Sequence, residues 1–209
     1  MRGGSKLRSI PEMEPGGAIG TTGGIERIVL ADPDAGIRLV PFTGDDAGDM
    51  DRLADEPGVY ENTYIPAQRG PDFASGWVAM YLAGWKDGTR AGFTIRRMGD
   101  DGFLGFASLP TIDLDKLEAE AGYVVAEKAR QRGIATAALR LISRWGIDSL
   151  GLMRIYLHID PANLGSRRVA ERCGYAYEGT LRSVYFKEGR RVDTALYSLL
   201  PSDARYGTP

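Results

Sequence analysis

One short stretch, residues 130–136 (Arg-Gln-Arg-Gly-Ile-Ala-Thr), constrains the fold more than any other part of the chain. The apolar run at residues 122–126 that precedes it is typical of a buried strand. From Ile134 onward, apolar residues recur at i, i+3, i+4, i+7, i+8 and i+11, which predicts an amphipathic helix. The sequence therefore predicts a strand that turns directly into a helix, with Gly133 at the helix start.

This turn has the chemistry of an anion site. The first backbone N–H groups of a helix lack intrahelical partners and lie at the positive end of the helix dipole, so they bind phosphate readily. Gly133 lets the backbone approach an anion without a Cβ in the way, and Arg130 and Arg132 add positive charge. An ordinary strand–helix connection with exposed arginines explains the same residues equally well. The stretch has neither the Gly-Lys-Ser/Thr of a nucleoside-triphosphate loop nor the third glycine of a dinucleotide fingerprint.

Composition narrows the class of protein. The net charge of −2 argues against a nucleic-acid partner, because such proteins are usually markedly basic. A single cysteine permits no internal disulfide and no cysteine zinc cluster, so we expect a reducing, cytoplasmic setting. No apolar run approaches the ~20 residues of a membrane span, and no signal peptide is visible at the N-terminus. We therefore expect neither a membrane nor a metal among the binding partners.

The length of 209 residues predicts one domain with tails. Residues 1–24 are rich in glycine and contain no aromatic residue, so we expect a flexible N-terminal tail. Residues 25–203 are expected to form the single domain, followed by a short C-terminal tail at 204–209. Helices are predicted from residue 43 to about 57, where Pro57-Gly58 should end the first one, and at 72–86, 134 onward and 164–173. Strands are predicted at 25–30, 37–42, 91–97, 103–109, 120–126, 152–160, 180–187 and 190–199.

The chain contains one histidine, His158. Apolar and polar residues alternate strictly through 152–160, which places His158 on the more polar face of that strand. Without a second histidine or a nearby serine or cysteine nucleophile pattern, the sequence favours a structural role for His158 over a catalytic one.

Several motifs, in this order, resemble the GNAT superfamily of acetyl-CoA-dependent N-acetyltransferases. Arg130-x-x-Gly133-x-Ala135 resembles its Q/R-x-x-G-x-G/A pyrophosphate motif, and residues 119–123 resemble the strand before that motif. Segments 160–166, 171–175 and 178–182, with the terminal 189–193 hairpin, resemble the branch of ribosomal-protein alanine and serine N-terminal acetyltransferases. The resemblance spans about residues 37–200.

The resemblance implies an α/β (α+β) GNAT fold. Its mixed, mostly antiparallel sheet would have about seven strands, with helices on both faces and a V-shaped opening between the fourth and fifth core strands. Acetyl-CoA, the implied cosubstrate, would lay its pantetheine arm in this opening and its pyrophosphate on the turn. The implied cofactor-binding residues are Tyr123, Val124, Val125, Ala126, Arg130, Gln131, Arg132, Gly133, Ile134, Ala135, Thr136, Asn163 and Ser166.

Direct acetyl transfer needs a base, because an ammonium group has no lone pair to attack the thioester. Glu120 is the first candidate, since several GNAT enzymes carry a basic glutamate near this position. Glu118, two residues earlier and on the same face, is the alternative, and both are equally compatible with solvated strand-end charges. Tyr185 on the penultimate strand can point into the cleft or serve only in packing.

Direct acetyl transfer also needs a general acid that protonates the leaving thiolate. Many GNAT enzymes carry a tyrosine seven residues after the asparagine, and here that position is Ala170. In the ribosomal-protein branch a serine lies where Ser166 stands, and its hydroxyl can hydrogen-bond the thioester sulfur. Serine is also a preferred helix-capping residue, so a purely structural role explains Ser166 equally well.

The sequence thus predicts an N-acetyltransferase that acts on a primary amine, either a protein N-terminus or a small amine such as an aminoglycoside or a polyamine. A non-catalytic acyl-CoA-binding protein with the same fold, and a phosphate-binding domain unrelated to CoA, are the alternatives. We expect a monomer or a homodimer.

Overall fold

The computed structural model describes residues 24–203 except 64, 67 and 188. Apart from Gly24, the two predicted tails lie outside the described residues. No helix in the described part of the chain has the length and apolar character needed to cross a membrane.

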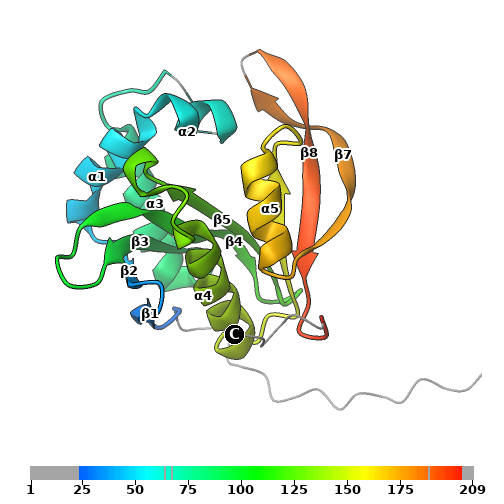
Figure 1. The fold of residues 1–209 in the computed structure, drawn as a ribbon, viewed down its shortest axis with the longest axis horizontal. Helices are drawn as coiled ribbons and strands as arrows, with labels where there is room; N and C mark the ends of the chain where they lie inside the picture. Colours follow the sequence, from blue (N-terminus) through cyan, green and yellow to red (C-terminus); the bar gives the residue numbers. More distant parts are fainter. Residues whose placement is uncertain (1–23, 64, 67, 188, 204–209) are drawn as a thin grey trace, which may run out of the picture.

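One mixed sheet of eight strands runs through the molecule in the order β1-β2-β3-β4-β5-β6-β8-β7 (Figure 1). All neighbouring strands are antiparallel except β5 and β6, which are parallel. This confirms the predicted mixed sheet, with eight strands where about seven were expected. The strands are β1 (Leu30–Asp32), β2 (Ile37–Pro41), β3 (Ala91–Arg97), β4 (Phe103–Asp113), β5 (Glu118–Val125), β6 (Arg154–Ile159), β7 (Ala176–Lys187) and β8 (Arg190–Leu199).

Helices cover both faces of this sheet. The described residues form five α-helices, namely α1 (Ala47–Ala54), α2 (Pro57–Asn62), α3 (Phe73–Asp87), α4 (Ile134–Asp148) and α5 (Leu164–Arg172), with short 3-10 turns at Gly44–Asp46 and Glu127–Ala129. Apolar residues form two clusters, one around α4 and the other around α1 and α3. Adjacent residues of β5 join different clusters, since Tyr123 packs against the first and Val124 against the second. The sheet therefore separates two apolar layers, as the period-2 geometry of strands requires.

The central strands part at one point. β5 and β6 pair only over Glu118–Glu120 and Arg154–Tyr156, although β5 continues to Val125 and β6 to Ile159. Counted from β2, these are the fourth and fifth core strands, so the opening lies where the resemblance predicted it.

Two predictions about local structure are wrong. The first strand begins at Leu30 instead of Ile25, whose N–H donates to the Trp85 carbonyl and ties that segment to the end of α3. Pro57-Gly58 opens α2 as well as following α1. Proline suits the first position of a helix because no intrahelical bond needs its missing N–H.

Candidate functional site

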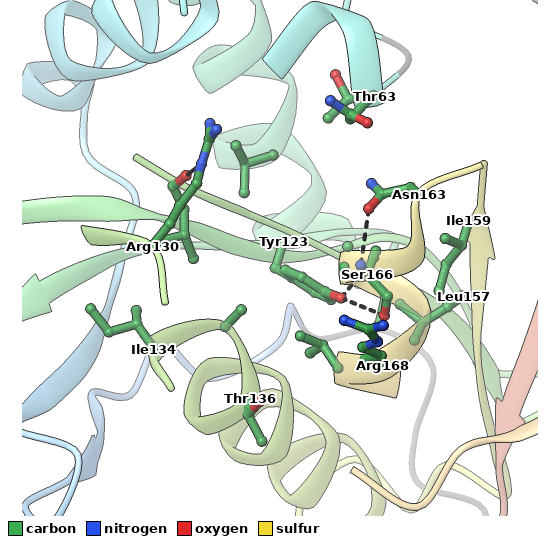
Figure 2. A pocket seen from close by; sticks show the side chains of 18 of the residues that line it. Thr63, Tyr123, Arg130, Ile134, Thr136, Leu157, Ile159, Asn163, Ser166 and Arg168 are labelled. Atoms are coloured by element: carbon green, nitrogen blue, oxygen red, sulfur yellow. Dashed lines mark hydrogen bonds between the residues drawn. The ribbon is translucent and has the colours of Figure 1, made fainter. Parts of the chain in front are cut away.

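A cleft of about 790 Å³ opens where β5 and β6 part, within the usual size range of small-molecule sites (Figure 2). Its walls come from α2, β5, the turn after β5, β6 and α5. Most of the predicted cofactor-binding residues line it, and so does Glu120. Ala126 and Arg132 do not line it, because the Ala126 N–H pairs with Leu104 and Arg132 is exposed beside the turn. The predicted residues that line the cleft are Tyr123, Val124, Val125, Arg130, Gln131, Gly133, Ile134, Ala135, Thr136, Asn163 and Ser166.

The turn at one end of the cleft is shaped by two left-handed residues. Gln131 has φ +62° and Gly133 has φ +77°, and α4 begins immediately afterwards at Ile134. A Cβ placed on Gly133 would have no neighbour within 4 Å. The glycine is therefore required by the backbone conformation and leaves open space before the first N–H groups of α4.

Arg130 connects this turn to α2. Its Nε donates to the Val125 carbonyl at 3.0 Å, and its Nη2 lies 3.1 Å from Glu56 Oε2. The same carboxylate oxygen accepts a bond from the Glu127 N–H at 2.9 Å. The Arg130 guanidinium is thus paired within the protein, so its side chain holds the turn in place beside the start of α2.

Tyr123 and Ser166 meet across the opening (Figure 2). The Tyr123 hydroxyl lies 2.7 Å from Ser166 Oγ and donates to the Ser166 carbonyl at 3.2 Å. Burial raises the pKa of the Tyr123 phenol well above its ordinary value. The residue that caps α5 is Asn163, whose Oδ1 accepts from the Ser166 N–H at 2.9 Å. Of the two explanations that the sequence leaves open for Ser166, side-chain capping of this helix is therefore not what the structure shows, and the Ser166 hydroxyl lies beside Tyr123 in the lining of the cleft.

The resemblance places Tyr123 on the strand that would pair with the pantetheine arm, but it assigns no role to the Tyr123 hydroxyl. At position 170, where the resemblance leads us to expect a tyrosine, Ala170 is fully buried. The phenol beside Ser166 comes instead from β5 on the opposite arm of the opening. Its partner lies 43 residues away along the chain, so no local pattern could have indicated the contact.

Glu120, His158 and Tyr185 form a second polar cluster. His158 Nδ1 lies 2.8 Å from the Tyr185 hydroxyl and 3.4 Å from Glu120 Oε1. The His158 ring also meets Tyr156 and Tyr185 edge to face, with centroids 5.4 and 5.6 Å apart. The structure thus brings two predicted catalytic residues together around a histidine that the sequence favoured as structural.

Sheet topology explains how these three side chains meet. Glu120 pairs with Tyr156 in the last parallel pair before the strands part, and His158 lies two residues farther along β6 on the same face. Tyr185 comes from β7, whose register shifts between Leu181 and Tyr185 around Ser183, at φ +57°. Irregularities of this kind bend a strand and re-aim its side chains.

The same sheet face carries a partly exposed ion pair, Arg154–Glu178, outside the cleft lining. Both Arg154 guanidinium nitrogens donate to Glu178 at 2.7 Å, and Ser198 Oγ donates to Glu178 Oε1 at 2.6 Å. These bonds, led by those from Arg154, lower the pKa of Glu178 from 4.5 to about 2. Glu118 begins β5 on this face, and its charge, with that of Glu120, adds to burial in raising the pKa of Tyr156.

Comparison with known proteins identifies the family to which this arrangement belongs. The sequence profile of the acetyltransferase (GNAT) domain matches residues 37–176. A putative ribosomal N-acetyltransferase of Bacillus subtilis is 35% identical over 101 residues, which cover 48% of this chain and 55% of that relative. The chain thus spans little more than half the length of this curated relative.

Solved structures show the same fold over more of the chain. RimJ of Mycobacterium smegmatis, in complex with a CoA disulfide, superposes with a TM-score of 0.72 at 26% identity, covering 86% of this chain and 91% of that one. Spermidine N-acetyltransferase of Vibrio cholerae, in complex with CoA and spermine, superposes with a TM-score of 0.71 at 20% identity, covering 81% and 98%. At that identity the second likeness shows the fold alone.

Proposed function

Because this chain belongs to the acetyltransferase (GNAT) domain family, we propose that it transfers the acetyl group of acetyl-CoA directly to a primary amine, most readily a protein N-terminus. One observation carries this proposal. A single cleft joins the left-handed turn at Gly133 to the unpaired edge of β5 and to the carboxylate of Glu120. Such a cleft can hold a long thioester and a base at the same time.

Acetyl-CoA would bind along this cleft. Its pyrophosphate would rest on the N–H groups of residues 131–136, beside Gly133, where an added Cβ would meet no atom within 4 Å. The pantetheine arm would pair with β5 at residues 123–125, beyond the point where β6 leaves it and before Ala126, whose N–H is bonded to Leu104. Asn163 would contact the same arm from the start of α5.

The reaction needs a deprotonated amine, a stabilised oxyanion and a proton for the thiolate. A base at the branch of the two strands, where Glu120 lies, would remove the amine proton and add about 10²- to 10⁴-fold to the rate. Ser166 would donate its hydroxyl hydrogen bond to the sulfur as negative charge develops there, near the N-terminus of α5. Tyr123, 2.7 Å away, would orient that hydroxyl by turning its phenol proton from the Ser166 carbonyl to Ser166 Oγ, which frees the Ser166 proton for the sulfur.

Two kinds of acceptor are supported. The Bacillus subtilis relative whose name refers to ribosomal N-acetylation favours a protein amine, and the motifs at 160–166, 171–175 and 178–182 that resemble the ribosomal-protein branch favour its N-terminus. Matches to spermidine N(1)-acetyltransferases, at 27% identity over 99 residues for the enzyme of Vibrio cholerae, favour a polyamine as the second candidate. Glu118 and Glu120 on the sheet face suit any cationic amine, so acceptor assays must separate the two.

The test is an acceptor screen with acetyl-CoA, N-terminal peptides, aminoglycosides and polyamines, followed by thiol release and by mass spectrometry of the products. We expect acetylation of a peptide α-amine at a higher kcat/KM than that of spermidine. A thermal shift with CoA but no thiol release would instead indicate a non-catalytic acyl-CoA-binding protein. The absence of any shift would point to an anion-binding domain unrelated to CoA.

A further inference from the structure

We infer that His158 is the catalytic base of this site, accepting the amine proton at Nε2, and that Glu120 and Tyr185 are positioning residues that orient its ring. The inference rests on the proposed acetyl transfer and reassigns the role of Glu120 within it. Two oxygen atoms, one from Glu120 and one from Tyr185, lie beside His158 Nδ1.

The two oxygen neighbours of Nδ1 select the tautomer of the ring. An ionised carboxylate offers only lone pairs, so Glu120 Oε1, 3.4 Å away, is attracted to Nδ1 only when that nitrogen carries a proton. The Tyr185 oxygen, 2.8 Å away, can accept from the same N–H. In the neutral ring this leaves the lone pair on Nε2, which is the nitrogen able to take a proton.

Nε2 is the ring nitrogen that a substrate can reach. His158 lines the cleft, and 15% of its side chain is exposed. Within the described part of the chain, Arg38 Nε is the one buried side-chain nitrogen or oxygen without a hydrogen-bond partner. Nε2 makes no hydrogen bond to the described residues, so it must be open to solvent.

His158 also lies nearer than Glu120 to the mouth of the opening. Glu120 sits at the last β5–β6 pair, whereas His158 is on the free arm of β6. Its Nδ1 side is occupied by Glu120 and Tyr185, so an amine in the cleft meets Nε2 before it meets the carboxylate. The titratable groups around the ring are Glu118 and Glu120 on β5, Tyr156 and Asp160 on or next to β6, and Tyr185 on β7, while β8 contributes the apolar Leu196.

Every proton in this step has a donor and an acceptor. The amine enters as an ammonium ion and gives one proton to Nε2, forming an imidazolium that the Glu120 carboxylate stabilises. The amine nitrogen then bonds to the thioester carbon, and the C–S bond breaks as the carbonyl re-forms. The thiolate takes the proton of the Ser166 hydroxyl, the second proton lost by the acylated nitrogen restores that hydroxyl, and the imidazolium releases its proton to water.

The experiment compares pH profiles of kcat/KM for the full chain and three variants, with acetyl-CoA and the best acceptor of the screen. His158→Asn keeps an N–H donor near the position of Nδ1 but has no titrating nitrogen. Glu120→Gln keeps an oxygen that accepts from Nδ1 but removes the charge. Tyr185→Phe removes only the hydroxyl. The acceptor amine titrates identically in all four proteins.

We expect His158→Asn to lower kcat/KM about 10²-fold or more at pH 7. It should also abolish the acidic limb of the pH profile, in which kcat/KM rises as the base of the enzyme loses its proton. This deficit should shrink at high pH, where the amine deprotonates unaided. Glu120→Gln should keep the limb but move it to lower pH, because the imidazolium loses a neighbouring negative charge. Tyr185→Phe should keep the limb with the smallest loss.

The opposite pattern overturns the inference: a limb lost in Glu120→Gln and kept in His158→Asn would make Glu120 the base. A wild-type profile in His158→Asn would also overturn it while leaving the proposed function intact. If the wild-type protein acetylates no amine, the proposed function fails and the inference falls with it. CoA affinity and melting temperature check the folding of each variant, and His158→Gln provides the same test if His158→Asn does not fold.

Discussion

The two ends of the cleft are formed by different parts of the chain: the backbone at one end and side chains at the other. At the Gly133 end, backbone N–H groups and two left-handed residues form the site, and the arginine of the motif is engaged with Glu56. At the branch of the strands, side chains form it, with Glu120, His158 and Tyr185 each coming from a different strand. Any chain that forms the same turn presents the same backbone N–H groups. The side-chain cluster, by contrast, requires the order of strands found in this sheet.

This contrast suggests a division of labour. Every acyl-CoA carries the same pyrophosphate, so a backbone site serves any member of the family regardless of its acceptor. In the proposed function the acceptor and its proton are handled at the other end, where single substitutions would change the chemistry without disturbing CoA binding. The experiments below test whether the two ends are separable in this way.

The strongest way to break the backbone end is Gly133→Val. A branched residue at φ +77° is strained and places its side chain where an anion must approach. Losing two charge-assisted hydrogen bonds, at about 1.5–3 kcal/mol each, predicts a fall in CoA affinity of about 10²-fold or more. Isothermal calorimetry with CoA measures the effect, and kcat at saturating acetyl-CoA should change much less.

Gly151→Val is the matched control. Gly151 has φ +68°, and a Cβ there also has no neighbour within 4 Å, but the residue lies between α4 and β6 and does not line the cleft. Both variants should lose similar stability, and only Gly133→Val should lose CoA affinity. Equal CoA affinity in the two folded variants would show that the turn is an ordinary strand–helix connection.

The middle of the cleft is tested by Ser166→Ala and Tyr123→Phe. If Ser166 contacts the sulfur mainly in the transition state, Ser166→Ala should lower kcat and kcat/KM together. A hydrogen bond to a developing charge is worth about 1.5–3 kcal/mol, which predicts a loss of about 10- to 10²-fold. Tyr123→Phe should show a smaller loss of the same kind, since the phenol acts through Ser166 Oγ.

Melting curves separate this role from a structural one. Asn163 supplies the side-chain cap of α5, so Asn163→Ala should reduce stability by about 1 kcal/mol. Ser166→Ala should leave the melting temperature nearly unchanged. If Ser166→Ala lowered the melting temperature and left kcat unaltered, the role of Ser166 would be structural, and the general acid would be another group.

The difference between the two ends also explains what the sequence could predict. The turn, the long helix after it and the opening between β5 and β6 follow from contiguous residues and a family motif, and the structure reproduces them. The partners of Tyr123 and His158 lie 43 and 27 residues away, across strands whose order the sequence does not state. Residues 57–62 were misjudged because Pro57-Gly58 signals the end of one helix as readily as the start of another.

His158 shows the limit most clearly. Strand alternation placed it correctly on the polar face, but a lone histidine carries no local signal of its neighbours. Glu120 and Tyr185 were each proposed for separate roles. Only the parallel pairing of β5 with β6, and the irregularity in β7, bring all three together.

The smallest expected effect concerns the ion pair between Arg154 and Glu178, which lies outside the cleft. The folded state lowers the pKa of Glu178 from 4.5 to about 2, chiefly through its bonds to Arg154. A lowered carboxyl pKa contributes stability that is fully present above about pH 4.5 and is lost as the pH falls toward 2. The side chains of Arg154 and Glu178 are 29% and 36% exposed, so the contribution at pH 7 should stay below about 1 kcal/mol.

Glu178→Gln should therefore flatten the fall in unfolding free energy between pH 4.5 and 2, as measured by urea denaturation at a series of pH values. Arg154→Met should flatten the same region only in part, because the bond from Ser198 to Glu178 remains. Because Glu178 lies outside the cleft, kcat/KM at pH 7 should match the wild-type value in Glu178→Gln. A large loss of kcat/KM there would mean that the ion pair and the Glu120–His158–Tyr185 cluster act as one network, and the side-chain end of the cleft would extend across the whole open face of the sheet.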